Sequence, residues 1–239
     1  MIRKRVCSVL SVSLVFLFLL GSSPGGAQSE RHSKNSSVDA RAVSLVEQLK
    51  ADKDQAGIAW KRLSVEEKQL VLGYVHPQFY TEGKQADLVA ISSSRPAKKI
   101  AGAVMPSSTD DWGGDYYVDN VYSCGAYNTF VTFVRGNGPG KLTLSYQKTV
   151  SNKWSANVGI SASGVSAGVG FDVTHSESMT YSYETEVPGG HQWEIDAYNV
   201  FDGVTFDIYW DPWVGDPYYV GYGDAYQFVG VDYWVWQVY

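Results

Sequence analysis

The feature that most constrains the fold is an alternation of apolar and polar residues with a period of two, which runs from about residue 112 to the C-terminus. A period of two places successive side chains on opposite faces of an extended strand. Segments such as NTFVTFVRG and QFVGVDYWVWQVY are rich in Val, Tyr, Phe and Trp, and turn clusters such as GNGPG at 136–140 separate them. We therefore expect a mainly β fold, either an antiparallel β-sandwich or an elongated β-sheet domain.

The chain before this region carries a helical period instead. Residues 42–49 place apolar side chains at helical spacing, with Ser37 available as the N-cap. Ser64 and Glu67 have the spacing of a capping box, and Pro77 would end the helix that follows them. These signals predict a short helical region in front of the β domain.

The N-terminus has the pattern of an export signal. A basic cluster at 3–5 is followed by an apolar run at 6–20, which is shorter than the about 20 residues that a membrane-spanning helix needs, and by small residues up to Ala27. We therefore expect a secreted, extracellular protein; the alternative is that the segment remains as an uncleaved N-terminal anchor. The expected divisions are a signal peptide at 1–27, a flexible tail at 28–37, a helical region at 38–92, a linker at 93–111 and the antiparallel β domain at 112–239.

Charge and cysteine content narrow the classes of partner. Without the three basic residues of the signal, 16 Lys and Arg stand against 25 Asp and Glu, a net charge of −9. This balance argues against a nucleic-acid partner and against capture by anionic lipid through charge alone. Cys7 lies in the signal, so Cys124 is left alone, and its strand-like neighbours favour a buried thiol over one that pairs between chains.

An amphipathic hairpin is predicted at 154–173. Apolar residues share one parity from Trp154 to Ala162 and the opposite parity from Val165 to Val173. A parity change across a two-residue turn, here 163–164, keeps one face of a hairpin apolar. Each arm has nine residues, and about 9–11 suffice for a tilted strand to cross a bilayer.

The hairpin and its hydroxyl-rich flanks, TVSNKWSANVGISASGVSAGVGFDVTHSESMTYSYETEVPGG, resemble the membrane-insertion region of aerolysin-like β-pore-forming proteins. The resemblance extends over about residues 141–190, and the chain otherwise resembles small secreted bacterial proteins. The alternative is that 141–187 forms ordinary strands of a secreted β-sandwich. The resemblance implies lipid-facing roles for Val158, Ile160, Val165, Val169 and Phe171, and pore-facing roles for Asn157, Ser161, Ser166 and Asp172.

Motifs for covalent chemistry lack the context that they need. Residues 164–168 match G-x-S-x-G, but a nucleophile elbow requires a strand-to-helix turn, and the residues that follow alternate like a strand. The four histidines are scattered without metal-ligand spacing. Glu194 and Asp196 would share a strand face, as would Glu184 and Glu186, and such pairs are common on solvent-exposed faces. We expect no catalytic residue, no metal and no cofactor.

Aromatic residues concentrate near the C-terminus. Two Asp-Pro turns lie among rings that suit stacking on a sugar or another ligand. The candidate ligand-binding residues are Trp210, Trp213, Tyr218, Tyr219 and Tyr222. Strand alternation instead predicts core positions for Tyr233, Trp234 and Trp236.

Two hypotheses follow for a secreted, non-enzymatic β protein. In the first, the protein is toxin-like and forms pores, inserting the 154–173 hairpin into a target membrane as a homo-oligomer. In the second, the protein is an extracellular binding module that recognises a glycan or a cell surface through its aromatic loop, without membrane insertion.

Overall fold

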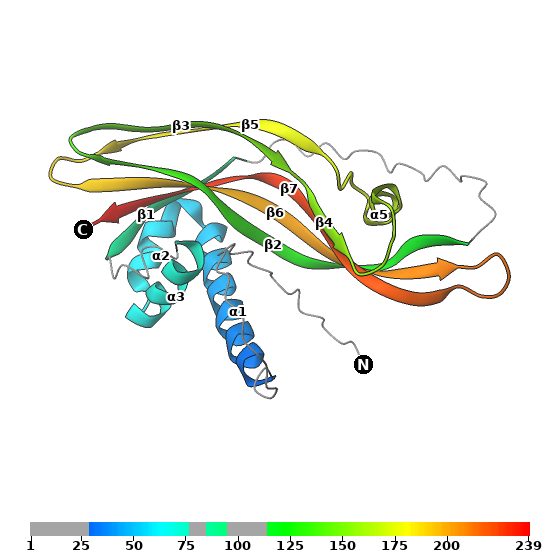
Figure 1. Ribbon diagram of the computed structural model, residues 1–239. Helices are drawn as coiled ribbons and strands as arrows, with labels where there is room; N and C mark the ends of the chain where they lie inside the picture. Colours follow the sequence, from blue (N-terminus) through cyan, green and yellow to red (C-terminus); the bar gives the residue numbers. More distant parts are fainter. Residues whose placement is uncertain (1–28, 77–84, 95–113) are drawn as a thin grey trace, which may run out of the picture.

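Long antiparallel strands set the shape of the molecule (Figure 1). The computed structural model describes residues 29–76, 85–94 and 114–239, with side chains in the first helix from residue 40 onward. The helices are α1 (Ser29–Ala51), the 3-10 turn η1 (Lys53–Gln55), α2 (Ala56–Arg62), α3 (Val65–Val75) and α5 (Ala162–Val169). The strands are β1 (Ala86–Ser94), β2 (Asp115–Asn137), β3 (Gly140–Ser151), β4 (Lys153–Ala156), β5 (Ser176–Val187), β6 (Gln192–Asp211) and β7 (Tyr218–Val238). The mainly β, antiparallel fold expected from the alternation is confirmed.

One sheet runs the length of the molecule. Its strand order is β1-β7-β6-β2, and β4 pairs with β7 beyond the end of β1. The β6–β7 hairpin is paired from Gln192–Val238 at one end to Trp210–Tyr218 at the other, so its loop marks one tip of the molecule (Figure 1). All pairings are antiparallel, as the run of strands without intervening crossover helices predicts.

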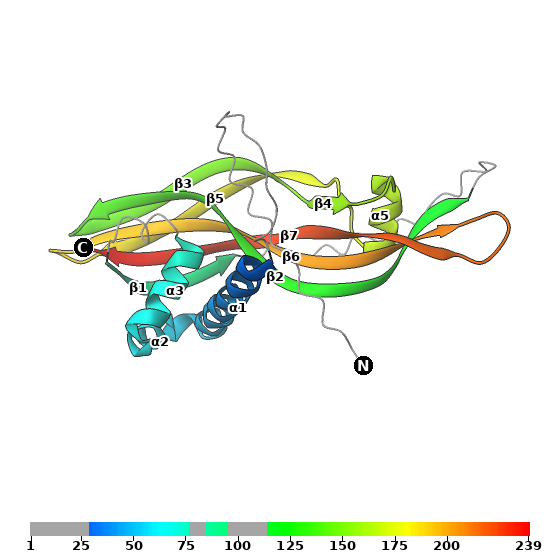
Figure 2. The ribbon, with the colours of Figure 1, turned by 60° about the horizontal axis from the view of Figure 1, so that its bottom comes forward.

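A two-stranded ribbon, β3–β5, lies on one face of this sheet (Figure 2). Its buried side chains, including Leu142, Leu144 and Tyr181, pack with residues of β6 and β7 in one apolar cluster. The phenol of Tyr181 donates a hydrogen bond to Asn199 Oδ1 (2.7 Å), and the Ser182 backbone N–H donates to the Tyr233 hydroxyl oxygen (3.0 Å). The ribbon is therefore held to the sheet by apolar packing and by these two hydrogen bonds.

The helices cover the opposite face at the end of the sheet that carries the C-terminus (Figure 1). Trp60 of α2 is fully buried against Trp236, with the ring centroids 5.4 Å apart in an edge-to-face arrangement. Along β7, Tyr233 faces the ribbon while Trp234 and Trp236 face the helices, so both faces of this strand are covered. The predicted core positions of these three rings are confirmed, and no helix in the described ranges has the length and hydropathy of a membrane span.

The helical region departs from its predicted boundaries in part. The capping box is confirmed: Ser64 Oγ accepts from the Glu67 N–H, and the Glu67 carboxylate accepts from the Ser64 N–H. The predicted cap at Ser37 is wrong, because α1 begins at Ser29 and takes in most of the expected tail. The region also contains α2, which was not predicted, and β1, which binds it to the main sheet through β7. The predicted signal peptide, Pro77 and most of the predicted 93–111 linker lie outside the described residues.

The state of Cys124 also differs from the prediction. Its side chain is half-buried and disulfide-bonded, so the expectation of a buried free thiol is wrong. Cys7, the other cysteine of the chain, lies outside the described residues.

Candidate functional site: the segment between the ribbon strands

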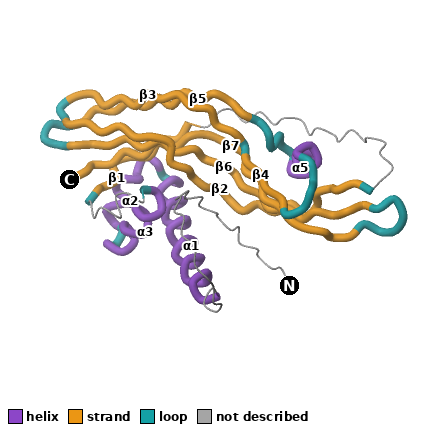
Figure 3. The backbone as a smooth tube through the Cα atoms, viewed as in Figure 1, coloured by secondary structure: helices purple, strands orange, loops and turns teal. Residues whose placement is uncertain are grey.

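The segment that joins β3 to β5, residues 152–175, is not a hairpin in this structure (Figure 3). After Asn152 the chain forms β4 on the edge of β7, then a loop, the two-turn helix α5 and a turn that leads into β5. The predicted pair of nine-residue strands at 154–173 is therefore wrong for this conformation. The physical reason is local. Ser161 caps a helix whose small residues permit close approach, and Gly170 ends it in the left-handed conformation.

The apolar side chains of this segment pack against the main sheet. All five predicted lipid-facing residues belong to one apolar cluster with Phe206 and Ile208 of β6 and Ala225 of β7. Within that cluster Ile160 and Val165 are buried, whereas the other predicted residues are half-buried. These five are Val158, Ile160, Val165, Val169 and Phe171. The structure brings them together on the body of the protein rather than on an exposed hairpin face.

The predicted pore-facing residues hold the same segment in place by hydrogen bonds. Asn157 Oδ1 accepts from the Tyr222 N–H (2.8 Å), and Ser161 Oγ accepts from the Gly164 N–H at the start of α5 (3.1 Å). The Ser166 hydroxyl donates to the Ala162 carbonyl oxygen (2.8 Å) and accepts from the Val173 N–H (3.1 Å). Ser166 thus satisfies the Val173 N–H, a backbone group of the predicted hairpin arm, while Asn157 joins the loop to β7.

Asp172 completes this set at the turn before β5. One of its oxygens, Oδ1, accepts from both the backbone N–H and the hydroxyl of Thr174, at 2.8 and 2.7 Å. These hydrogen bonds stabilise the ionised form and lower the pKa of Asp172. The carboxylate therefore stabilises the turn in its charged state.

The G-x-S-x-G match lies inside α5, which overturns the expectation that these residues alternate as a strand. Ser166 is the third residue of the motif, and its hydroxyl bonds the helix backbone as described above. A nucleophile elbow would instead expose this oxygen on a turn between a strand and a helix. The arrangement favours a structural role for Ser166.

A second candidate surface lies at the tip of the molecule formed by the β6–β7 loop (Figure 1). The side chains of Trp213 and Tyr218 are 81% and 55% exposed, and Tyr219 and Tyr222 are also exposed. Trp210 is half-buried, because its ring packs edge-to-face on Tyr116 with 4.7 Å between centroids. Four of the five predicted ligand-binding residues thus present rings to solvent.

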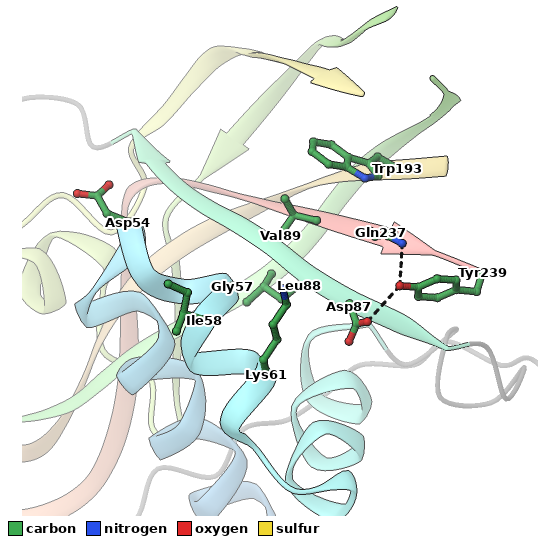
Figure 4. A pocket seen from close by; sticks show the side chains of 10 residues that line it. All are labelled: Asp54, Gly57, Ile58, Lys61, Asp87, Leu88, Val89, Trp193, Gln237 and Tyr239. Atoms are coloured by element: carbon green, nitrogen blue, oxygen red, sulfur yellow. Dashed lines mark hydrogen bonds between the residues drawn. The ribbon is translucent and has the colours of Figure 1, made fainter. Parts of the chain in front are cut away.

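A shallow groove of about 350 Å³ lies between α2 and β1 (Figure 4). One side is lined by Tyr239, Asp87 and Gln237. There the Tyr239 hydroxyl donates to Asp87 Oδ2 (3.2 Å) and accepts from Gln237 Nε2 (2.7 Å). Ile58 and Lys61 line the other side. The groove is open and has few converging polar groups, so it is a weak candidate for a binding site.

Buried charges meet where α3 ends against β6. His76 Nε2 lies 3.2 Å from Glu194 Oε1 and 3.6 Å from Asp196 Oδ2, and all three side chains are buried. Arg135 of β2 pairs with the second oxygen of Glu194. Burial and the neighbouring Glu194 charge raise the pKa of Asp196 well above its ordinary value. The expectation that Glu194 and Asp196 lie on a solvent-exposed face is wrong.

Sequence reasoning missed this cluster because its members are far apart in the chain, and no spacing signal joins His76 to β6. The placement of two acids at i and i+2 in a strand of buried, apolar residues was the one available clue.

Comparison with known proteins shows a weak structural resemblance to pore-forming toxins. The chain is similar to a candidate pore-forming toxin from Bacteroides vulgatus, with 9% identity, a TM-score of 0.25, and coverage of 53% of this chain and 57% of that chain. It is also similar to the oligomeric pore-forming toxin pro-Monalysin, with 17% identity, a TM-score of 0.24, and coverage of 60% of this chain and 74% of that one. For the parasporin-2 toxin of Bacillus thuringiensis the identity is 12% and the TM-score 0.12, over 67% and 76% of the two chains.

No protein-family model matches the chain, and neither does any curated protein. The resemblance predicted from the sequence is confirmed at this weak structural level.

Proposed function

We propose that this chain is a secreted, toxin-like β protein that forms pores by extending the β3–β5 ribbon through residues 152–175 into a target membrane. The observation that carries the proposal is the register of the ribbon. Ser151 pairs with Ser176, and beyond this pair the Asn152 N–H already donates to the His175 carbonyl oxygen (2.9 Å). Continued without a shift, this register meets at a two-residue turn, Ser163-Gly164, which is where the sequence pattern also predicts one.

The continued register would give each face of the extended ribbon a uniform character. The apolar face would continue the buried face of the ribbon that carries Leu142 and Leu144. Its new cross-strand pairs would be Trp154–Val173, Ala156–Phe171, Val158–Val169, Ile160–Ala167 and Ala162–Val165. The opposite face would pair Ser155–Asp172, Asn157–Gly170, Gly159–Gly168 and Ser161–Ser166. Each added arm would have about 11 residues, enough for a tilted strand to cross a bilayer.

The free-energy cost of exposing apolar side chains means that residues 152–175 can leave the sheet and extend the ribbon only where a membrane is present. Nine apolar side chains of residues 152–175 would leave the cluster on the sheet, and three of them, Ile160, Val165 and Val173, are buried. Because a fully buried side chain of this kind contributes about 1.5–3 kcal/mol and a half-buried one contributes less, release into water is opposed by on the order of 10 kcal/mol. A lipid environment offsets this loss because it removes the same side chains from water. A single hairpin in lipid would leave backbone groups unpaired at both edges, so several copies must close into a barrel. The proposal therefore includes a homo-oligomer on the membrane.

A disulfide that ties β4 to β7 tests the release step. Ser155 and Asp224 are directly opposed in the antiparallel pairing, at the about 4.5–5.5 Å between Cα atoms that suits a disulfide. The double variant Ser155→Cys/Asp224→Cys is expected to release no dye from vesicles when oxidised and to regain release when reduced. The vesicles are phosphatidylcholine with and without cholesterol, and total lipid extracts of animal and bacterial cells.

The matched control is Asp202→Cys/Gln227→Cys, which joins β6 to β7 at another directly opposed pair and also removes one aspartate. These two strands need not separate, so this variant is expected to release dye in both redox states. Absence of release by the wild type from every vesicle would overturn the proposal, as would equal release by oxidised and reduced Ser155→Cys/Asp224→Cys.

The second candidate function is recognition of a glycan or cell surface by the exposed rings at the tip. The observation that favours it is the exposure of Trp213 and Tyr218, since exposed aromatic rings stack on sugars. The open end of the β3–β5 ribbon points toward the same tip, so this surface would also be the part of a pore former that meets its target first (Figure 1). Glycan-array binding that Trp213→Ala abolishes, from a protein that never releases dye, would favour this function over pore formation.

A further inference from the structure

We propose that His76, Glu194 and Asp196 form a binding site for one divalent transition-metal ion, with Zn²⁺ as the expected occupant. The three side chains come from two parts of the fold. His76 is the C-cap of α3, while Glu194 and Asp196 lie on the same face of β6. One ligand atom from each of the three lies within 4.8 Å of the others.

The separations fit a common metal centre. Bonds of about 2.0–2.2 Å in a tetrahedral site place ligand atoms about 3.3–3.6 Å apart. His76 Nε2 lies 3.2 Å from Glu194 Oε1 and 3.6 Å from Asp196 Oδ2. One imidazole nitrogen and two carboxylate oxygens are a ligand set that suits Zn²⁺ or Co²⁺ better than Ca²⁺, which prefers oxygen ligands alone.

An unsatisfied polar atom points to the same conclusion. Within the described part of the chain, Glu194 Oε1, the oxygen 3.2 Å from His76 Nε2, is fully buried and accepts no hydrogen bond. A buried carboxylate oxygen in this state is costly. A proton on His76 Nε2 can serve one of the two carboxylates at a time, whereas a cation among the three groups contacts all of them.

Neighbouring groups would hold the ligands in position. Arg135 binds Glu194 Oε2, the oxygen that faces away from His76. The Tyr198 hydroxyl lies 3.3 Å from Asp196 Oδ2 and donates to the Val75 carbonyl oxygen (2.6 Å). Such outer contacts orient metal ligands in proteins. An ion here would cross-link the end of α3 to β6 and thereby join the helical region to the sheet.

The test is a metal titration of the full protein, made without a polyhistidine tag and stripped with EDTA. ZnCl₂ is expected to bind at one ion per chain in calorimetry. The midpoint of thermal unfolding should rise by about 5–10 °C when free Zn²⁺ exceeds the Kd a hundredfold. CoCl₂ should give visible d–d absorption bands that Zn²⁺ then displaces.

Variants assign the ion to these residues. Glu194→Gln and Asp196→Asn are nearly isosteric and should each weaken binding by at least about a hundredfold, since loss of an outer contact alone costs about 10- to 100-fold. The control His175→Gln/His191→Gln removes two exposed histidines and should bind as the wild type does.

Because a variant at a buried site can fail to fold, the wild-type titration is decisive on its own. Absence of saturable Zn²⁺ and Co²⁺ binding by the wild type would overturn the proposal, as would unchanged binding by a folded Glu194→Gln or Asp196→Asn protein. Dye release plays no part in these measurements, so their outcome is independent of pore formation.

Discussion

Gly168 offers the sharpest test of the idea that residues 152–175 have two conformations. In α5 a Cβ atom added to Gly168 would lie 2.2 Å from Val118 Cβ and 2.6 Å from Val118 Cγ1. Normal contacts between such carbons begin near 3.4 Å, so either α5 or β2 would have to move by more than 1 Å. In the extended ribbon the same residue would lie on the hydroxylated face opposite Gly159, with room for a side chain.

The variant Gly168→Val should therefore selectively destabilise the conformation seen in this structure, in which residues 152–175 pack on the main sheet; we call it the stored conformation. Overpacking of this kind costs about 1–3 kcal/mol, and Val is more favourable than Gly in a helix by only a few tenths of a kcal/mol. Val is also favoured over Gly in a strand, by up to about 1 kcal/mol. The equilibrium between stored and extended conformations should shift by about 2 kcal/mol, which is about thirtyfold.

Hydrogen–deuterium exchange of the peptides that cover 158–173, followed by mass spectrometry, measures this shift. Exchange in these peptides should accelerate about thirtyfold in Gly168→Val if opening remains in rapid equilibrium, and dye release should begin sooner. Peptides from β6 should be unchanged.

The control is Gly159→Val. An added Cβ at Gly159 meets no atom within 4 Å, so the stored conformation should tolerate it. Because the two glycines face one another in the proposed ribbon, both variants alter that state similarly. Equal exchange rates in Gly168→Val, Gly159→Val and the wild type would refute the reasoning.

Three further predictions concern stability. Ser64→Ala should lower the free energy of unfolding by about 1 kcal/mol through loss of the α3 cap, measured by urea denaturation. The pKa of Asp172 is lowered in the folded state, so its contribution to stability is complete above the ordinary value of 3.8 and is lost as the pH falls through the folded-state pKa. The exchange rate in the 152–175 segment, divided by the intrinsic amide exchange rate at each pH, should therefore rise below about pH 4, and Asp172→Asn should remove this dependence. Asp232→Asn should cost about 3 kcal/mol, because the nearly buried Lys50 ammonium, 2.9 Å from this carboxylate, would lose its closest counter-charge; an unchanged denaturation midpoint would contradict this.

The class of the fold and several local elements could be predicted from the sequence, because short-range chemistry determines them. Period-two alternation predicts extended strands. The Ser64–Glu67 spacing predicts a helix start, and the structure has both hydrogen bonds of that capping box. The β7 rings alternate between two apolar clusters as the pattern predicts. In each case the interacting groups are close in the chain or repeat with the period of the element.

Tertiary contacts decided the conformation of residues 152–175. Their alternation is compatible with a hairpin, and the ribbon register agrees with it, yet in this structure Val165 and its neighbours are buried against β6 and β7 as a short helix. The proposed extended ribbon would cover the same apolar side chains with lipid instead of with the sheet, so in this proposal the choice depends on whether a sheet face or a membrane is available to them. Likewise, only folding could bring His76 beside Glu194 and Asp196, since no local pattern encodes the proximity of residues on separate elements.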